Sequence, residues 1–324
     1  MGQSGRSPIN LPPGYFARPA TMDDVSAVTE LLNAAEIAEW GEPDFTEDEL
    51  RDDWEHFHGD PGKSITLVVA PDNTLVGYMA ITDNGHGAIE ADGYSHPGWV
   101  GKGIGTWLIQ ESERMAQDII AGLPSTQRVT IRSFTAGSNE RGLALLENEG
   151  YDAIRHFWRM EIEFDGPLPQ PEWPSGVRIA DARENVDEPG LYTVIETAFS
   201  EHFQLTPKQD FDAWLLERKR HGFDPALWAV VWHGDEMIGA GLGRMTGEGT
   251  GWISLLGVRK DWRGRGIGRA ILLHLLNRFK ERGAPSVALG VDAANVTGAI
   301  RLYESVGMKP VRNFVLFEKV LREG

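Results

Sequence analysis

The sequence predicts a mixed α/β sandwich that the chain builds twice, one copy after the other. Three observations support this fold class. Short apolar runs typical of strands alternate with segments whose apolar residues recur at helical spacing. Four sequence blocks occur in the same order in both halves of the chain. A proline-rich segment separates the halves, and a length of 324 residues favours two domains over one.

The repeated blocks indicate an internal duplication. The clearest pair is GWVGKGIGTWLI at 98–109 and DWRGRGIGRAIL at 261–272. The other matched pairs are TLVGYMAI with EMIGAGLG, LLENEGY with LYESVGM, and FWRMEIEF with FVLFEKVL. A repeat period this long means two copies of a domain rather than a solenoid.

The linker composition sets the expected domain boundaries. Four prolines and two glycines lie between the periodic regions, within EFDGPLPQPEWPSGVRI, and such a segment is typically extended. We therefore expect a flexible arm at 1–14, an N-terminal domain at 15–165, a linker at 166–176 and a C-terminal domain at 177–324.

Each copy shows the same order of elements. An opening strand leads to one or two helices, two or three strands, a glycine-rich segment with its helix, another strand, a helix ending in glycine and a last strand. In the first copy the early elements are YFARPAT, DDVSAVTELLNAAE, SITLVVA, TLVGYMAIT and AIEADGY, followed later by RVTIRSF. In the second copy they are VRIADA, GLYTVIETAFSEHF, LWAVVWH, EMIGAGLGRM and GWISLLGV, followed by SVALGV.

Composition excludes several classes of function. The chain has no Cys, so disulfides, thiolate metal sites and cysteine nucleophiles are excluded. No stretch approaches the ~18 apolar residues of a membrane span, and the first residues lack an apolar signal core. We expect a cytoplasmic protein with no membrane contact and no metal site.

The net negative charge comes entirely from the first half of the chain. The net charge is −17, and residues 1–170 hold 11 Lys and Arg against 28 Asp and Glu, whereas residues 171–324 hold 20 of each. Much of the excess lies at 36–60, which is either a solvated helix face or a surface that attracts a cationic substrate or a basic partner. Nucleic-acid binding is not expected, because it needs a net cationic surface. A polyanionic ligand is expected to bind the second half more readily, because the net charge of that half is zero.

The glycine segment of the second copy has the features of a phosphate cradle. It follows a strand and opens a helix, whose first backbone N–H groups have no partner and carry a positive dipole. Glycines at alternate positions remove the Cβ atoms that would keep a diphosphate away, and arginines add donors and charge. The segment differs from the Walker loop and from the Rossmann fingerprint in composition and spacing.

The segment Arg-x-x-Gly-x-Gly resembles the acetyl-CoA loop of the GNAT superfamily of N-acetyltransferases, and NVTGAIRLYESVGM resembles that superfamily's later helix. A tandem pair of this length is similar to mycothiol synthase and its relatives. The resemblance implies two GNAT-like domains, each with a mixed, splayed sheet flanked by helices. It also implies acetyl-CoA as co-substrate, bound by Leu256, Gly257, Val258, Arg263, Gly264, Arg265, Gly266, Ile267, Gly268, Arg269 and Asn295.

The resemblance also implies the catalytic roles. Tyr303 should lie near the thioester sulfur and act as general acid toward the departing thiolate. Mycothiol synthases hold a Glu where this chain has Trp252, so the general base must come from elsewhere. Glu201 is our choice, with His202 and Glu248 as alternatives.

The first copy is predicted to be degenerate. Its loop reads VGKGIGT, with Val100 in place of Arg263 and only Lys102 for charge, and Leu146 stands in place of Tyr303. A leucine side chain cannot protonate a thiolate. This copy is therefore expected to support the fold or to form one side of the substrate site, with weak acetyl-CoA binding as the alternative.

The sequence thus predicts an acetyl-CoA-dependent N-acetyltransferase that acts on a primary amine of a small molecule, with its active site in the C-terminal domain. The alternative is a non-catalytic CoA-binding sensor or scaffold. The acidic first half favours a cationic small molecule as the acceptor. A monomer is favoured, because a duplicated chain can imitate a dimer within itself.

Overall fold

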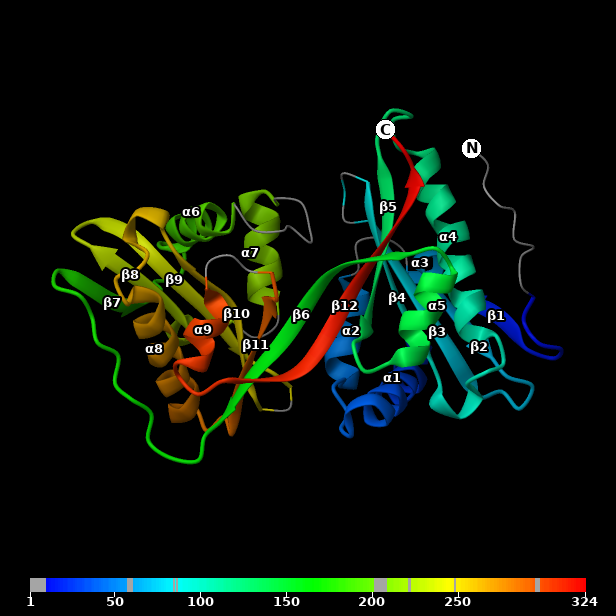
Figure 1. The fold of residues 1–324 in the computed structure, drawn as a ribbon, viewed down its shortest axis with the longest axis horizontal. Helices are drawn as coiled ribbons and strands as arrows, with labels where there is room; N and C mark the ends of the chain where they lie inside the picture. Colours follow the sequence, from blue (N-terminus) through cyan, green and yellow to red (C-terminus); the bar gives the residue numbers. More distant parts are fainter. Residues whose placement is uncertain are drawn as a thin grey trace. The chain divides into compact units, whose positions relative to one another are not determined.

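The structure, a computed structural model, describes residues 10–56, 61–83, 85, 87–200, 209–220, 223–247, 249–294 and 298–324. It contains two compact units, whose helices and strands are labelled in Figure 1. Unit 1 comprises residues 1–156 together with 313–324, and unit 2 comprises residues 157–312. The first nine residues of the expected arm lie outside the described residues.

Unit 1 follows the element order predicted from the sequence. Its helices and short turns are η1 (Met22–Asp24), α1 (Val25–Trp40), α2 (Glu47–Glu55), α3 (Pro61–Ser64), η2 (Pro97–Trp99), α4 (Ile104–Ala121) and α5 (Glu140–Asn148). Its strands are β1 (Phe16–Pro19), β2 (Ile65–Val69), β3 (Leu75–Asp83), β4 (Ala88–Ser95) and β5 (Val129–Ala136), and they lie in this order in the sheet. The pairs are antiparallel except β4 with β5, which is parallel.

Unit 2 repeats this arrangement. Its helices and short turns are α6 (Glu188–Phe199), α7 (Phe211–Arg220), η3 (Pro225–Leu227), η4 (Lys260–Trp262), α8 (Ile267–Glu281) and α9 (Ala299–Glu304). Its strands are β7 (Val177–Asp181), β8 (Trp228–His233), β9 (Glu236–Met245), β10 (Gly251–Val258) and β11 (Ser286–Asp292). They are ordered β11-β10-β9-β8-β7, with the parallel pair between β10 and β11.

The last strand of each copy completes the sheet of the other unit. β6 (Asp152–Glu163) comes from the first copy, yet its residues 157–163 pair antiparallel with β11 of unit 2. β12 (Lys309–Arg322) comes from the second copy, yet it pairs antiparallel with β5 of unit 1. The two units therefore differ from the expected ranges 15–165 and 177–324. The physical reason lies in the duplication, because β5 and β11 are equivalent strands and accept either of two similar partners.

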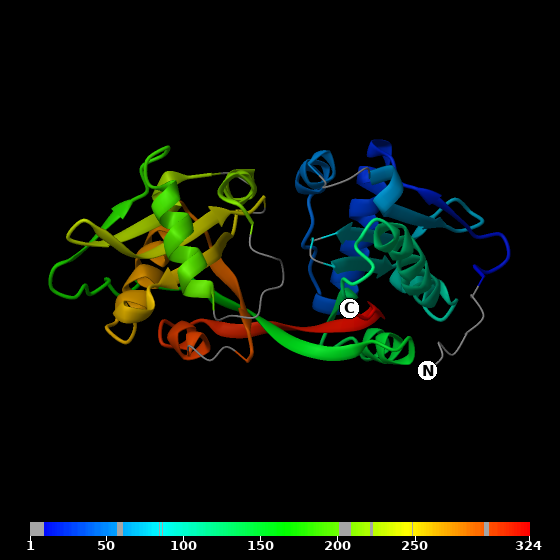
Figure 2. The same cartoon turned by 90° about the horizontal axis from the view of Figure 1, so that it is seen from above.

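The sheet of unit 2 is covered on both faces by helices. Val230 packs with α6 and α7 in one apolar cluster, whereas its neighbour Val231 packs with α8 in another. Successive strand residues point to opposite faces, so a strand buried on both faces is apolar throughout. The views in Figures 1 and 2 show α6 and α7 apart from α8 and α9 in this unit. The sheet of unit 2 therefore has one layer of helices on each face.

Helix α8 lies very close to the sheet. A Cβ atom on Gly243 of β9 would lie 2.5 Å from Cζ of Phe279, and one on Gly251 of β10 would lie 2.6 Å from Cδ1 of the same ring. Phe279 is fully buried, and burial of a side chain of this size stabilises the fold by about 2–3 kcal/mol. The glycines in these strands are therefore needed for the approach of α8.

The expected linker at 166–176 contains no helix or strand and runs along unit 2. The Nδ2 group of Asn277 on α8 donates to the carbonyl oxygen of Pro169 at 3.2 Å, and Lys280 donates to the carbonyl of Gly166. Leu168 and Trp173 pack against the apolar cluster under α8. Among the described residues, no helix has the length and apolar content needed to span a bilayer.

Candidate active site

The parallel strands β10 and β11 separate soon after they begin. They pair only at Gly251 and Trp252, whereas the antiparallel partner β9 follows β10 as far as Val258. A bulge at Ser254 coincides with the separation. Among the described residues, the β11-facing edge of 253–258 has no strand partner. Apart from the carbonyl of Val258, which accepts a hydrogen bond from Arg263, the backbone groups along this edge are therefore available to a ligand. The splayed sheet implied by the resemblance is present.

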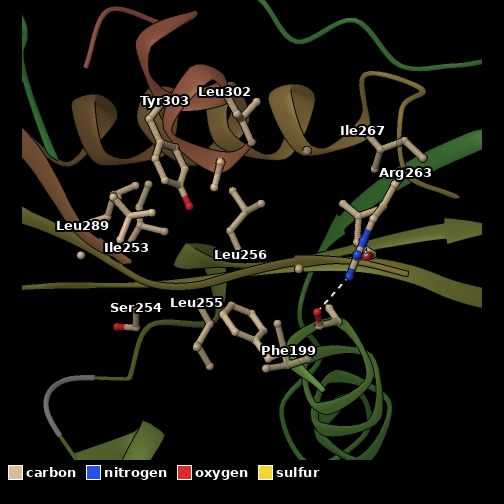
Figure 3. Close-up of a pocket in the computed structure, with 18 of the residues that line it drawn as sticks. Phe199, Ile253, Ser254, Leu255, Leu256, Arg263, Ile267, Leu289, Leu302 and Tyr303 are labelled. Carbon is tan, nitrogen blue, oxygen red and sulfur yellow. Dashed lines mark hydrogen bonds between the residues drawn. The ribbon is translucent and has the colours of Figure 1, made fainter. Parts of the chain in front are cut away.

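A cavity of about 670 Å³ lies in unit 2 at this separation. Figure 3 shows β10 crossing it, with Leu302 and Tyr303 of α9 on one side and Phe199 of α6 on the other. The cavity is thus lined from both helical layers, through the gap between the strands. Most of its lining is apolar, as is usual for small-molecule sites.

The glycine loop has the backbone conformation that the cradle requires. Gly264 and Gly266 have φ angles of +75° and +81°, in the left-handed region where an L side chain is strained. A Cβ atom on either would meet no atom within 4 Å, so the space beside this backbone is open. Gly266 is the N-cap of α8, whose first-turn N–H groups have no intrahelical acceptor. The loop therefore fits the diphosphate of acetyl-CoA.

Gly268 lies within the first turn of α8, at the edge of the cavity. A Cβ atom there would lie 3.4 Å from Cδ2 of Leu302, which is an ordinary van der Waals contact. Packing of α8 on α9 therefore does not by itself require a glycine at this position. Ile267, between Gly266 and Gly268, is buried and anchors the start of α8.

The loop arginines Arg263 and Arg265 bind different parts of the protein. Arg263 donates from Nε to the carbonyl oxygen of Val258 at 3.1 Å and from Nη2 to that of Ala198 at 2.9 Å; Figure 3 marks the second bond. Arg265 donates to the carbonyl of Asp261 at 3.1 Å and lies over the ring of Trp262. The sequence predicts both as diphosphate ligands, but the structure shows these donors bound to the protein.

Arg263 and Arg269 both line the cavity. Because two donors of Arg263 already bind protein carbonyls, its first effect is to join the end of β10 to the last turn of α6. Arg269 follows the N-cap by three residues, in the first turn of α8. It is therefore the loop arginine best placed to add charge to the helix N-terminus.

Tyr303 is buried in the wall of the cavity. Its exposed fraction is 9 %, and Figure 3 shows its hydroxyl directed toward β10. Burial raises its pKa to about 12, so the phenol keeps its proton at neutral pH. The hydroxyl has no hydrogen-bond partner among the described residues. A protonated donor directed into the cavity is what a general acid requires.

Several of the predicted site residues lie outside the described residues. These are Glu201 and Asn295, together with the alternative bases His202 and Glu248. Trp252, which occupies the position of the missing Glu, lies on β10 before the strands separate. Its ring faces the guanidinium of Arg159 at 5.7 Å.

Sequence reasoning missed three charged residues of the cavity wall. Glu196 of α6, Arg218 of α7 and Asp292 at the end of β11 all line it. Asp292 accepts a hydrogen bond from the backbone N–H of Ala294 at 2.8 Å, which shapes the turn after β11. A signal existed for Asp292, because ligands often bind beyond the carboxyl ends of parallel strands. The two helical residues belong to no motif.

Comparison with known proteins agrees with this geometry. The model of the acetyltransferase (GNAT) family matches residues 25–144 and 189–308, one match in each copy. Two mycothiol acetyltransferases are similar in sequence. The protein of Saccharopolyspora erythraea is 31% identical over 250 residues, covering 75% of this chain and 82% of the relative. That of Geodermatophilus obscurus is 32% identical over 298 residues, covering 87% and 90%.

Solved structures show the same tandem fold. A GCN5-related N-acetyltransferase from Sphaerobacter thermophilus is 36% identical, with a TM-score of 0.87 over 97% of this chain and 98% of that chain. A tandem GNAT protein from the clavulanic acid biosynthesis pathway is 14% identical, with a TM-score of 0.73 over 94% and 98%, and this likeness concerns the fold alone.

Proposed function

Because this chain belongs to the acetyltransferase (GNAT) family and is an N-acetyltransferase that uses acetyl-CoA, we propose that unit 2 transfers the acetyl group to a primary amine of a small molecule. The observation that carries this proposal is the cavity of unit 2. It brings the open edge of β10, the glycine loop and the hydroxyl of Tyr303 into one space. Acetyl-CoA supplies the acetyl thioester at this site.

The residues of unit 2 have separate tasks in binding. The backbone of 264–269 at the start of α8 would hold the diphosphate, because its N–H groups are unpaired and its glycines leave the approach open. Backbone groups of Leu256, Gly257 and Val258, beyond the strand separation, would pair with the pantetheine amides. Asn295 keeps its proposed contact with the arm of the co-substrate.

The proton transfers need an acid and a base. Tyr303 would donate its phenolic proton to the thiolate sulfur. Burial raises its pKa to about 12, so the proton is present on the phenol at neutral pH. A neutral amine is the nucleophile, so an ammonium acceptor must first lose a proton. We propose Glu201 as the base; Glu196, five residues earlier and in the cavity wall, is the alternative among the described residues.

Unit 1 is proposed to be non-catalytic. Its loop glycines Gly101 and Gly103 have φ angles of +80° and +79°, as in unit 2. However, Leu146 occupies the position of Tyr303 and is buried, so no phenol is available there. The same copy has Val100 in place of Arg263, with an exposed fraction of 46 %.

Thiol release from acetyl-CoA, measured over a panel of amines, tests the proposal. The parent protein should release thiol with at least one amine and form the matching N-acetyl product by mass spectrometry. Leu146→Ala in unit 1 should leave the rate unchanged, whereas Tyr303→Phe should lower it strongly. Thiol release that is insensitive to Tyr303→Phe would place the reaction elsewhere.

A further inference from the structure

Arg218 is a charged residue of the cavity wall to which the acetyl transfer described above gives no role. It lies on α7 and lines the cavity together with Trp214 of the same helix and Phe199 of α6. These helices pack on one face of the unit-2 sheet, and α8 and α9 pack on the other. Arg218 therefore lies on the face opposite the helix that opens with the phosphate loop. In the proposed function the co-substrate is held on the face of α8 and α9, by the glycine loop and beside Tyr303, which leaves the face of α6 and α7 for the acceptor.

The guanidinium of Arg218 has few partners within the protein. Among the described residues its ion pair is with the adjacent Glu217, whose Oε1 lies 3.1 Å from Nη2. The exposed fraction of the Glu217 side chain is 41%, and its Oε2 also accepts from Gln209 at 2.6 Å. Exposed pairs of this kind contribute little.

The Nε donor of Arg218 is unpaired: it is buried and has no hydrogen-bond partner among the residues that the structure describes. Buried donors are usually satisfied, and a guanidinium has five N–H donors. The same cavity is lined by the apolar residues Phe199, Trp214 and Leu255, so a charge interaction within it is screened less than in water. A bound anion would supply the missing acceptor atoms.

We propose that Arg218 binds an anionic oxygen group of the acceptor, either a carboxylate or a phosphate. The acceptor is then an amine that also carries such a group, and this inference rests on the proposed acetyl transfer in unit 2. The planar fork of a guanidinium matches both anions through two parallel N–H bonds. Glu196 places a carboxylate in the same wall, which provides a counter-charge for the ammonium end of such an acceptor.

Matched acceptor pairs test the proposal and separate the two anions. Amino acids are compared with the amines that lack their carboxylate, such as leucine with isopentylamine, and glucosamine 6-phosphate is compared with glucosamine. For at least one pair type, kcat/KM of the parent should favour the anionic member by about ten- to a hundredfold. Arg218→Gln should abolish this preference, by loss of activity toward the anionic member alone, while the Kd for acetyl-CoA stays the same. The pair type that responds identifies the anion.

Glu217→Gln is the matched control. It removes the ion-pair partner of Arg218 but leaves the guanidinium in the wall, so the preference for anionic acceptors should persist or increase. If Arg218 acts only through its ion pair with Glu217 within α7, both variants will have the same effect and the proposal is overturned. It is also overturned if the parent acetylates neutral and anionic members equally well. If no amine of either kind is acetylated, the proposed function itself fails. The subsite is then tested by calorimetry, which compares the binding of the anionic members to the CoA-loaded parent with their binding to the CoA-loaded Arg218→Gln protein.

Discussion

Replacement of Gly266 by Asp is the sharpest test of the phosphate cradle, because the chain contains its own control. Gly266 and Gly103 hold the same place in the two copies, with φ angles of +81° and +79°, and a Cβ atom on either meets no atom within 4 Å. Each substitution therefore carries the same backbone strain, about 1–2 kcal/mol for a left-handed L residue. Only the substitution in unit 2 places a carboxylate beside the proposed diphosphate.

The electrostatic penalty follows from that position. A carboxylate about 6 Å from a doubly charged diphosphate, at an effective dielectric constant of about 40, is repelled by about 3 kcal/mol. This corresponds to a roughly hundredfold weaker Kd for acetyl-CoA. Gly266→Asp should therefore lose turnover at moderate acetyl-CoA concentrations, whereas Gly103→Asp should keep it.

Three measurements complete the experiment. Calorimetry gives the Kd for acetyl-CoA, thiol release gives turnover, and thermal unfolding shows that both variants lose a similar amount of stability. Gly266→Ala adds the strain without the charge, so its Kd should change far less than that of Gly266→Asp. The cradle is refuted if Gly266→Asp binds acetyl-CoA as tightly as the parent, or if Gly103→Asp is the variant that stops turnover.

Three further predictions concern side chains. Tyr303→Phe should reduce kcat by about 10²- to 10⁴-fold with little change in the Kd for acetyl-CoA; a normal kcat by stopped-flow thiol detection would remove its role as acid. Arg263→Gln removes two hydrogen bonds from a charged donor and should lower the free energy of unfolding by about 2–4 kcal/mol in denaturant titrations. The Kd of this variant for acetyl-CoA, measured by calorimetry, should change less than that of Gly266→Asp. A large change in Kd with unchanged stability would make Arg263 a phosphate ligand. The hydrogen bond from Arg18 lowers the pKa of Asp24 to about 2. This pair therefore stabilises the fold above the unfolded pKa of about 3.9, and its contribution is lost as the pH falls through 2. Asp24→Asn should cost about 1 kcal/mol at pH 7 and clearly less at pH 2 in urea titrations, and an equal cost at both pH values would contradict the assignment.

The order of elements was predictable because it depends on local patterns. The apolar run GWISLLGV is β10 in full, and the amphipathic run after the glycine segment is α8. The positive φ angles of Gly264 and Gly266 were also foreseeable, because alternate glycines at the start of a helix have few other reasons to occur. Each of these features is determined by the sequence of its own segment and does not depend on contacts with distant residues.

The exchange of the last strands was not predictable from such patterns. The segments FWRMEIEF and FVLFEKVL both indicate a strand, and the sheet edges offered by β5 and β11 are copies of one another. Strand periodicity determines which face of a strand is buried but not which of two equivalent edges it joins. The same limit applies to Arg263, because the motif gives its position whereas packing against α6 determines where its guanidinium points.

Comparison of the two copies separates what the fold provides from what catalysis requires. In unit 1, β4 pairs with β5 only over Ala88 to Glu90 and then separates, and Gly103 caps α4 in the left-handed conformation. Both features of the cradle therefore persist in a copy that has Leu146 where unit 2 has Tyr303. Glycine geometry and strand separation are backbone properties that folding alone can preserve, since they also position the helix against the sheet. The ring of Tyr303 packs in the apolar core of unit 2, which a leucine also does in unit 1, but that packing does not require the phenolic hydroxyl. The hydroxyl of Tyr303 is therefore the stronger support for the proposal that unit 2 is the catalytic copy.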